Sequence, residues 1–583
     1  MPKKILHLLN SKIVLYLAYL IPIVLLIGFM ARYGVNVPFA DEWGLVDTFH
    51  KVYTGEATLQ YLAGQHNEHR ILFPRIIFLA LAFPSKWEIA YERYFNVFLS
   101  IITFLAICRI AHNQHHSENK RSLHLANLLS CILIFSVVQH ETWLSGFQLT
   151  WVIITSCLAV AALLLDAPKS GPIRFLGAAL LCFVASFSSA HGLFPWLALL
   201  PSVVLIPNTF RQRFIKAILW FSLFAGCFAL YMHGYHKPPG HPDPLYFLDH
   251  PWSAANYLLT LLGSSLIRSR TGAVIAGLIL LFLFAIFALY YARNSKLRKL
   301  SAPWLSLGAF SILFALATTL GRAGFGAGQA MSTRYITASI FLTVSVIQMW
   351  RLLLDRSKTT GIASILGKWQ FQGFSGILIG ICIVNSFQAV SVWHGDWNHR
   401  SNGKACLEMI YLMDESHFIG DAPNSCLKHL FPATPPMKGW TDKLIDMGFR
   451  DFPQNVPFIS NPEKSYGAIE LSTDKESAIF TRDDTVSISG WAILPDNPKP
   501  PKIVILTEGD SQRFFASAYV EGESPDIAEK LGSNRYGRAG WSVAFSPEQM
   551  QPGEKKLKAW VYDPDGEQFI QLSGEPKIEV VEQ

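Results

Sequence analysis

Long apolar segments alternate with polar connections over the first two thirds of the chain, and this alternation stops after about residue 392. A helix needs roughly 20 consecutive apolar residues to cross a bilayer. The predicted fold class is therefore a polytopic α-helical membrane protein of about 11 transmembrane helices. Segments close to the required length lie at residues 13–32, 90–111, 122–139, 147–166, 173–190, 192–207, 214–232, 271–292, 302–320, 335–354 and 373–392.

One further apolar segment, at residues 71–83, is only 13 residues long and has Pro74 and Arg75 near its start. Counting it as a span would move every later connection to the opposite side of the membrane. We therefore predict an interfacial or re-entrant helix for this segment. The connection after the first span then becomes one long outer loop at residues 33–89.

The composition changes abruptly beyond the last predicted span. Residues 393–465 are polar, with many Pro, Asn and Asp residues, and predict a helical linker. Residues 466–583 contain short strand-like runs between Pro-, Gly- and Asp-rich turns, which is typical of an antiparallel β-sandwich. The chain thus divides into a transmembrane domain at 1–392, the linker, and a carboxy-terminal all-β sandwich domain. Strands are expected at residues 485–492, 502–506, 514–520, 541–545 and 557–562.

Composition indicates the class of protein, and the distribution of charge predicts which loops face the cytoplasm. With 51% hydrophobic and only 16% charged residues, the chain is not a soluble globular protein. Lys and Arg gather at the amino terminus and then in alternate connections, around residues 120, 170, 213 and 296 and at 351–368. The positive-inside rule assigns these connections to the cytoplasm. The net charge of +7 therefore gives no indication of a nucleic-acid partner, and the region after residue 392 is expected outside a cytoplasmic (inner) membrane.

Two cysteines are set apart from the other six. Cys406 and Cys426 alone lie in the predicted outer soluble region, whereas the rest lie in or beside predicted spans. The outer compartment is oxidising, and paired thiols in such a compartment form disulfides. We therefore predict a Cys406–Cys426 disulfide.

The predicted outer loops carry the candidate binding residues. Four arginines among them oppose the positive-inside rule, and guanidinium groups bind phosphate through paired hydrogen bonds. A lipid-linked phosphate or pyrophosphate would account for them, as would interfacial anchoring or ion pairing with acidic residues of the first loop. The candidates are His66, Glu68, His69, Arg70, Trp143, Gln148, Arg268, Arg270, Arg322, Arg334 and Tyr335.

An acidic pair, Asp41 and Glu42, directly follows the first span and opens an amphipathic helical pattern. One carboxylate can cap that helix, and the other is then available as a general base for an acceptor hydroxyl. Asp41 is our first choice for the base and Glu42 the second. In the run His66–Arg70, two histidines and a carboxylate have the chemistry of divalent-metal ligands, but their spacing matches no standard zinc motif. Metal binding and simple hydrogen bonding both stay open, and no cofactor is assigned.

This pattern resembles the GT-C class of membrane glycosyltransferases, which have many spans, a first outer loop opening with an acidic pair, and a carboxy-terminal outer domain. The resemblance covers residues 1–392, and the segments at 67–70, 321–322 and 332–335 are similar to segments of uncharacterised bacterial members. It implies a polyprenyl-phosphate-linked sugar donor, inversion at the anomeric carbon, and a first-loop carboxylate as base. The implied partners are that donor, a glycan or lipid-linked acceptor, and membrane lipids.

The sequence thus predicts an inverting glycosyltransferase of cell-envelope polysaccharide biosynthesis, acting at the outer face of the membrane. Two alternatives remain. An O-antigen polymerase or ligase would also need outer arginines. A lipid-linked glycan flippase or transporter would require charges near the middle of its spans or an internal repeat, and the sequence has few such charges and no repeat.

Overall fold

The computed structural model describes residues 12–115, 120–166, 171–205, 209–237, 245–356, 362–413, 426–432, 437–472, 478–497, 501–548 and 550–582. These residues form two compact units. Unit 1 contains the described residues up to 34 and those of 57–394, and unit 2 contains 35–56 and those of 395–583. The chain passes from unit 1 to unit 2 between residues 394 and 395. The first outer loop, predicted as one piece at 33–89, is instead shared between the two units.

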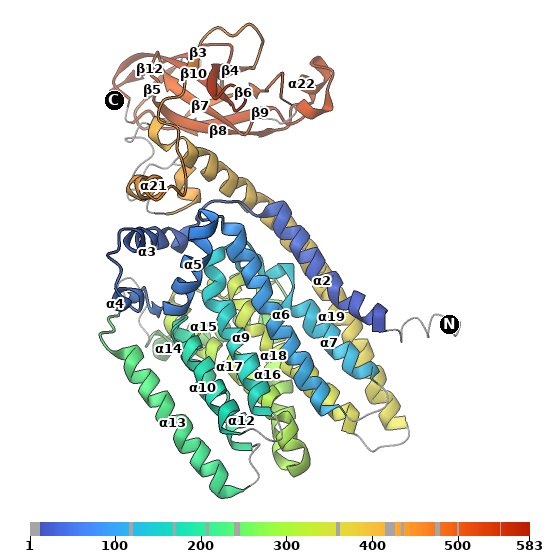
Figure 1. The fold of residues 1–583 in the computed structure, drawn as a ribbon. Coiled ribbons are helices and arrows are strands. Elements are labelled where there is room, and N and C mark those ends of the chain that lie inside the picture. Colours follow the sequence, from blue (N-terminus) through green and yellow to red (C-terminus); the bar gives the residue numbers. More distant parts are fainter. Residues whose placement is uncertain are drawn as a thin grey trace. The chain divides into compact units, whose positions relative to one another are not determined.

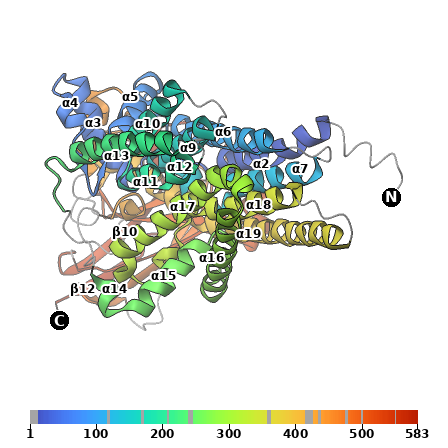
Figure 2. The same ribbon diagram turned by 90° about the horizontal axis from the view of Figure 1, so that it is seen from below.

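Unit 1 is a bundle of helices (Figure 1). The described residues include nine helical stretches that are long and apolar enough to cross a membrane, which indicates a multi-pass membrane protein. Helix α18 is the most deeply buried of them, whereas α2, α13, α16 and the first part of α19 are exposed over most of their apolar surface. Figure 1 shows α13 at one edge of the bundle, and the view from below shows α16 and α19 at its periphery (Figure 2). The long helices are α2 (Lys12–Tyr33), α6 (Ile89–Gln114), α7 (Arg121–Ile134), α9 (Leu149–Asp166), α13 (Phe210–Met232), α16 (Arg270–Arg293), α17 (Ser295–Arg322), α18 (Ile336–Arg356) and α19 (Ile362–Glu408).

Shorter elements of unit 1 lie between these helices. The helical ones are α4 (Leu59–Leu62), α5 (Leu72–Ser85), α8 (His140–Leu144), α10 (Pro172–Ser186), α11 (Phe194–Ala198), α12 (Leu200–Leu205), α14 (Tyr246–Asp249) and α15 (Pro251–Gly263). One hairpin is formed by β1 (Gln65–His66) and β2 (His69–Arg70). The 3-10 turns are η2 (Val137–Gln139), η3 (Gly146–Gln148), η4 (Ala190–Leu193), η5 (Ala323–Phe325), η6 (Gln329–Met331) and η7 (Thr333–Tyr335).

Nine of the eleven predicted spans coincide with the long apolar stretches. The other two, at 173–190 and 192–207, correspond to the shorter helix α10 and to the pair α11–α12, which pack against α9 and α17. The number of membrane crossings therefore stays a prediction. The segment 71–83 forms α5, whose first turn bonds to the carbonyl of Phe187 and whose end is held by a Trp87–Glu92 hydrogen bond at the start of α6. Both ends of α5 thus lie at one end of unit 1, as expected for a helix that does not cross.

The polar connections of unit 1 meet at that same end. The amide of Ala190 donates to Nδ1 of His69 at 3.3 Å, and the amide of Glu141 donates to Oγ1 of Thr333 at 3.3 Å. We call this end, formed by residues 57–71, 136–148, 187–193, 264–269 and 323–335, the polar end. Connections that lie far apart in the sequence therefore meet at one end of unit 1. Opposite it, Asp355 joins His115, Ser122 and Arg351 at 2.8, 2.6 and 3.1 Å.

The membrane orientation is a testable prediction. Because the predicted basic connections lie opposite the polar end, reporter fusions after residues 115, 295 and 360 are expected to report cytoplasm. A fusion after residue 400 is expected to report the outer compartment. A cytoplasmic signal from the last fusion would contradict the assignment. Residues 1–11, 116–119, 167–170 and 357–361, which carry part of the basic signal, lie outside the described residues.

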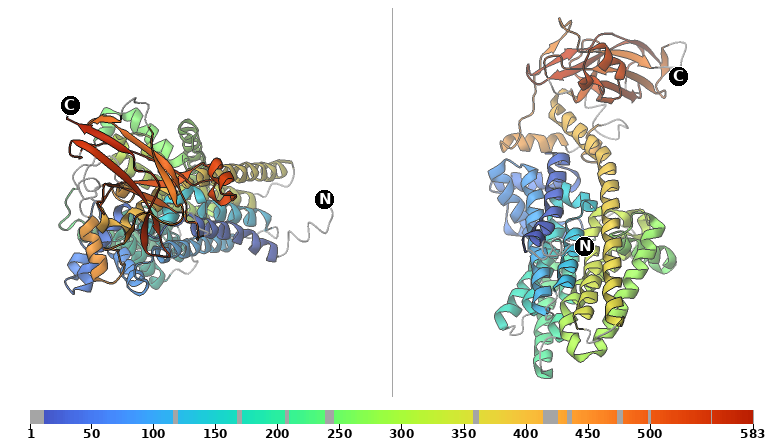
Figure 3. Two further views of the ribbon diagram at one scale, coloured as in Figure 1. Left: turned by 90° about the horizontal axis from the view of Figure 1, so that it is seen from above. Right: turned by 90° about the vertical axis from the view of Figure 1, so that its right-hand side faces the viewer.

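Unit 2 combines short helices with a β-rich domain, whose strands lie side by side in Figure 3 (left). All five predicted strands are present, and their sheet follows the order β3-β11-β10-β7-β8-β9-β6-β4, with β12 joining β10 to β5. Val504, Trp541 and Val561 are buried in its core. Its description as a sandwich stays a prediction. The strands are β3 (Phe458–Ile459), β4 (Gly467–Ser472), β5 (Ile479–Thr481), β6 (Val486–Ala492), β7 (Ile503–Glu508), β8 (Phe514–Gly522), β9 (Gly540–Phe545), β10 (Gly553–Asp563), β11 (Gln568–Gln571) and β12 (Lys577–Val581).

The helical part of unit 2 surrounds the predicted disulfide. Cys406, in the last turns of α19, is bonded to Cys426. The other helical elements are η1 (Ala40–Trp43), α3 (Gly44–Tyr53), η8 (Ile410–Leu412), η9 (Cys426–His429), α21 (Met437–Asp446), α22 (Pro525–Lys530) and η10 (Asn534–Tyr536). The segment 35–56 thus belongs to the same unit as the described residues of 395–465, which make up most of the linker predicted at 393–465.

The disulfide gives a second prediction. Thiol labelling of the denatured, unreduced protein is expected to leave Cys406 and Cys426 unmodified, and prior reduction is expected to expose both to the reagent. The buried Cys131 and Cys157, which are free thiols, serve as internal controls because denaturation alone makes them reactive. Labelling of Cys406 and Cys426 without reduction would contradict the bond.

Candidate functional site

A tight hairpin presents Glu68 at the polar end. Strands β1 and β2 pair Gln65 with Arg70 and His66 with His69, leaving Asn67 and Glu68 as the two-residue turn. Asn67 has φ of 48°, a left-handed conformation that asparagine tolerates better than most residues. The hairpin thereby places Glu68 in the turn and His69 at the start of β2, next to it. This arrangement follows from the local sequence His-Asn-Glu-His.

Glu68 forms an ion pair with Arg322, the last residue of α17. Its Oε1 atom also lies 3.7 Å from Nε2 of His69. Burial by itself raises the pKa of Glu68, but His69 and then Arg322 outweigh that effect and lower the pKa to about 2. Glu68 is therefore an ionised carboxylate at neutral pH. The pair joins the first predicted outer loop to the end of α17. Ion pairing with a first-loop acid was the alternative to phosphate binding that the sequence left open for this arginine.

This ion pair predicts a specific dependence of stability on pH. The unfolded chain protonates Glu68 near its ordinary value of 4.5, whereas the folded protein keeps it ionised down to about 2. The pair therefore contributes its full stability above about pH 5 and loses it as the pH falls towards 2. Thermal unfolding in detergent is expected to show the stability advantage of wild type over Glu68→Gln shrinking between about pH 5 and pH 3. Parallel curves for the two proteins would contradict the assignment.

A second carboxylate at the polar end, that of Glu141, bonds to the backbone of η7. The Oε2 atom of Glu141 accepts a hydrogen bond from the backbone amide of Arg334 at 2.8 Å. The Arg334 guanidinium lies over the ring of Tyr335, 5.6 Å from its centroid. Tyr335 is buried and stacks on Trp151 with ring centroids 5.7 Å apart. Turn η7 thus holds Arg334 through its backbone and its aromatic neighbour.

The hydroxyl of Tyr257 lies near enough to Arg322 and Arg334 for both to affect it electrostatically. Its hydroxyl, on the short helix α15, donates to Oε1 of Gln329 at 3.1 Å. Burial and then Tyr335 raise the pKa of Tyr257, while Arg322 and Arg334 act in the opposite direction. Both guanidinium groups therefore exert a positive field at the same hydroxyl. Two cations, a phenol and an amide thus lie near one another, together with the Glu68 carboxylate that pairs with Arg322. Guanidinium groups in such a place can bind an anion such as phosphate.

Two further arginines flank the connection that carries Gln329. Arg268 donates to the carbonyl of Met331 at 2.5 Å and to that of Ser264 at 3.3 Å. A Cβ atom added at Gly328 would lie 2.9 Å from Nη2 of Arg270, so this arginine packs closely on the same connection. Arg268 and Arg270 thus contact the connection that lies between Arg322 and Arg334. The four arginines come from two predicted outer connections.

The remaining unit 1 candidates have contacts of a structural kind. The Arg70 guanidinium donates to the backbone carbonyls of Tyr231 at 2.6 Å, Ala63 at 3.0 Å and His233. Each of its three nitrogen atoms therefore already donates to a backbone carbonyl. Trp143 is buried, and its indole donates to the carbonyl of Ser136 at 2.9 Å. These contacts favour a role in holding the loops over direct substrate binding.

His66 and Gln148 are both neighbours of Phe147. His66 contacts its ring, and Gln148 follows it in the sequence. The His66 ring is 5.4 Å from the Phe147 ring. Gln148, the last residue of η3, has a buried Oε1 atom without a hydrogen-bond partner among the described residues. His66 thus packs against the Phe147 ring, whereas the Oε1 atom of Gln148 can still accept a hydrogen bond.

The two predicted base candidates differ in their surroundings. Both belong to η1 in unit 2, and so to a different compact unit from the arginines. Glu42 is 1% exposed, and its Oε2 atom accepts a hydrogen bond from the amide of Phe39 at 2.9 Å. Asp41 is exposed. Glu42 is therefore the capping carboxylate, and Asp41 is the one open to a substrate.

Two site residues were missed in the sequence. Trp151 lies inside a predicted span, where aromatic residues usually pack against neighbouring helices, and nothing in its local pattern marks it. Tyr257 belongs to α15, which lies between the predicted spans at 214–232 and 271–292, where no helix was predicted. The apolar, proline-initiated run at 251–263 was the signal for a short helix there.

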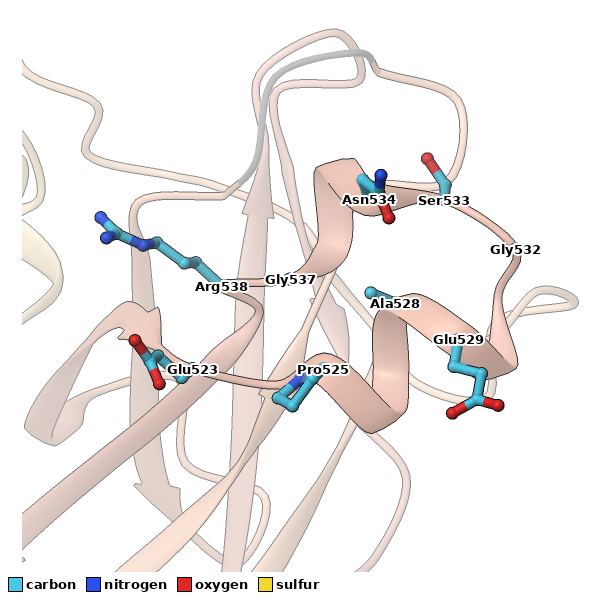
Figure 4. A pocket seen from close by; sticks show the side chains of 9 residues that line it. All are labelled: Glu523, Pro525, Ala528, Glu529, Gly532, Ser533, Asn534, Gly537 and Arg538. Carbon is cyan, nitrogen blue, oxygen red and sulfur yellow. The ribbon is translucent and has the colours of Figure 1, made fainter.

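A shallow pocket of about 610 Å³ lies in the β-rich domain, between α22 and η10. Its lining includes Glu523, Glu529, Asn534 and Arg538. Figure 4 shows Glu529 pointing outward on the side away from Arg538. Because its charged groups do not converge, we do not regard this pocket as the functional site.

No family model, curated protein or solved structure matches the chain. Within the described residues, no group of three or more His, Cys, Asp or Glu side chains is placed to hold a metal ion. The candidate site consequently rests on the arginine group at the polar end and on Asp41, each judged by its own chemistry.

Proposed function

We propose that this protein is an inverting membrane glycosyltransferase that takes its sugar from a polyprenyl-phosphate donor. The acceptor is a glycan or a lipid-linked glycan at the outer face of the cytoplasmic membrane. The observation that carries the proposal is that Arg270, Arg322 and Arg334 lie around one connection at the polar end of an apolar helical bundle. Arg268 holds that connection by donating to backbone carbonyls. Guanidinium groups at a membrane boundary suit a phosphate whose lipid tail lies in the bilayer.

The arginines would bind the donor and stabilise the leaving group. Arg322 and Arg334 both act electrostatically on the hydroxyl of Tyr257. A donor phosphate bound there would meet Arg334 and would compete with Glu68 for Arg322. When the bond between the anomeric carbon and the phosphate oxygen breaks, negative charge grows on the phosphate. Fixed cations at that position lower the barrier because they need no rearrangement during the reaction.

Asp41 would activate the acceptor. The acceptor hydroxyl oxygen attacks the anomeric carbon, a new glycosidic bond forms, and polyprenyl phosphate leaves with the bonding electrons. The hydroxyl proton passes to the Asp41 carboxylate. Attack from the side opposite the phosphate inverts the anomeric configuration. Glu42 stabilises the same turn because its carboxylate accepts a hydrogen bond from the amide of Phe39.

The proposal is tested with the full-length protein in lipid vesicles that contain polyprenyl-phosphate-linked sugars and extracts of envelope glycan as acceptor. Release of free polyprenyl phosphate together with an increase of acceptor mass by one sugar residue is the expected result. A protein that moves the lipid-linked substrate between leaflets without releasing polyprenyl phosphate would overturn the proposal in favour of a transporter.

A further inference from the structure

The loop that bears Asp41 is built into the carboxy-terminal part of the chain. Helix α3, which follows η1, packs against α21 within unit 2. The Asp47 carboxylate accepts from Lys443 Nζ at 2.6 Å and from the indole of Trp440 at 3.3 Å. His50 and Asp446 form a further pair at 2.9 Å. Residues three apart lie on one helix face, so these contacts join one face of α3 to one face of α21.

The immediate neighbours of Asp41 are held in the same way. Ala40 has φ of 50°, a left-handed conformation that a residue with a side chain adopts only when its surroundings enforce it. Its amide donates to the carbonyl of Leu430 at 2.8 Å. On the other side, the buried Trp43 stacks on Trp440, with ring centroids 5.6 Å apart and planes 16° from parallel. The exposed Asp41 therefore projects from a turn fixed on both sides by residues far away in sequence.

The disulfide supports this arrangement. Leu430 follows η9, whose first residue, Cys426, is bonded to Cys406 on α19. Leu430 also packs on Gly403: a Cβ atom added at Gly403 would lie 2.6 Å from the Cγ atom of Leu430. A continuous series of contacts thus runs from the disulfide through Leu430 to the amide of Ala40. At the far end of the segment, Arg450 donates to the carbonyl and the side chain of Asn36, each at 3.1 Å.

We infer that the carboxy-terminal region is an integral part of the catalytic apparatus, with Trp440 and Lys443 as positioning residues for Asp41. This inference rests on the proposed function, because it assigns Asp41 the role of base. A general base must lie within hydrogen-bond reach of the proton that it accepts. An error of about 1 Å in its position can cost roughly 100-fold in rate. Residues 395–450 therefore contribute to turnover through the position of Asp41, without touching the substrate.

The test uses the full-length double variant Trp440→Ala/Lys443→Met. Hydrogen–deuterium exchange of residues 35–56 is expected to become faster, while exchange in the β-rich domain stays unchanged. The turnover number is expected to fall by about 10- to 100-fold, with the KM for the donor within about threefold of wild type. The conservative variant Trp440→Phe/Lys443→Arg keeps the stacking and the charge, and it is expected to recover most of the turnover.

Two further variants make the result decisive. Lys555→Met/Lys558→Met removes three ion pairs within the β-rich domain, with Glu508 at 2.7 Å, Asp510 at 2.8 Å and Glu575 at 3.6 Å. It is the matched control, with turnover expected to match wild type. Cys406→Ser/Cys426→Ser leaves α3 and α21 unaltered, and it is expected to raise exchange around residues 40–43 and to lower turnover.

Unchanged exchange of residues 35–56 in Trp440→Ala/Lys443→Met would overturn the inference. Faster exchange with full turnover would also overturn it, provided that Asp41→Asn is inactive. If wild type itself transfers no sugar, the proposed function fails, and the assignment of positioning residues fails with it. If Asp41→Asn keeps full turnover, the choice of base fails independently of how the loop is held.

Discussion

Replacing Asp41 with asparagine is expected to lower the rate of sugar transfer by about 100- to 10,000-fold, the range that a positioned general base contributes. Asparagine preserves the size of the side chain but cannot accept the acceptor proton at neutral pH. Because Asp41 is exposed, the variant is expected to express and unfold like wild type. The measurement is the initial rate of transfer in vesicles, together with the melting temperature.

Glu42 provides the matched control for this prediction. Its Oε2 atom accepts the amide of Phe39, and an amide oxygen can accept the same bond. Glu42→Gln is therefore expected to keep most of the transfer activity. Glu42→Ala removes the cap and is expected to lower the melting temperature. If Glu42→Gln abolished transfer and Asp41→Asn did not, the two roles would be exchanged.

Replacing Arg334 with alanine is expected to raise the KM for the lipid-linked donor by about 10- to 100-fold. One hydrogen bond between charged groups is worth about 1.5–3 kcal/mol, which corresponds to that range of affinity. The backbone amide of Arg334, which bonds to Glu141, is unaffected by the substitution. Steady-state kinetics at varied donor concentration give the measurement.

Arg298 serves as the control for this arginine. It lies near the start of α17, the helix whose last residue is Arg322, and therefore at the opposite end of unit 1. Arg298→Ala removes the same charge away from the polar end and is expected to leave the donor KM within about twofold of wild type. Equal effects of the two substitutions would mean that Arg334 acts only through the net charge of the protein.

Hydropathy predicted much of unit 1, because the bilayer imposes a length and a composition on every spanning helix. It also separated α5 from the long helices, since that segment is too short and carries Arg75. The structure shows why the arginine is tolerated there: its guanidinium donates to the carbonyls of Leu62 and Gly64 at 2.8 Å each. Helix α15 was missed because a 13-residue apolar run between polar loops lacks the length by which spans are recognised.

The candidate site was harder to predict than the fold. The sequence located the outer arginines, yet it could not separate Arg70, whose fork is filled by backbone carbonyls, from Arg322 and Arg334. That difference depends on contacts with residues more than 150 positions away, such as Tyr231. Likewise, the packing of α3 on α21 pairs residues almost 400 positions apart, and no local pattern encodes it. By contrast, the capping role of Glu42 arises within four residues and was foreseen as one of two options.

The central claim is that this chain transfers a sugar to an envelope glycan by means of Asp41 and the arginines of the polar end. Its most direct test is mass analysis of surface polysaccharide and lipid A from host cells that lack the gene and are complemented with wild type or with Asp41→Asn. The account predicts that a glycan loses the mass of one sugar in the deletion strain, that wild type restores it, and that Asp41→Asn does not. Identical glycans in all strains, or full restoration by Asp41→Asn, would contradict it.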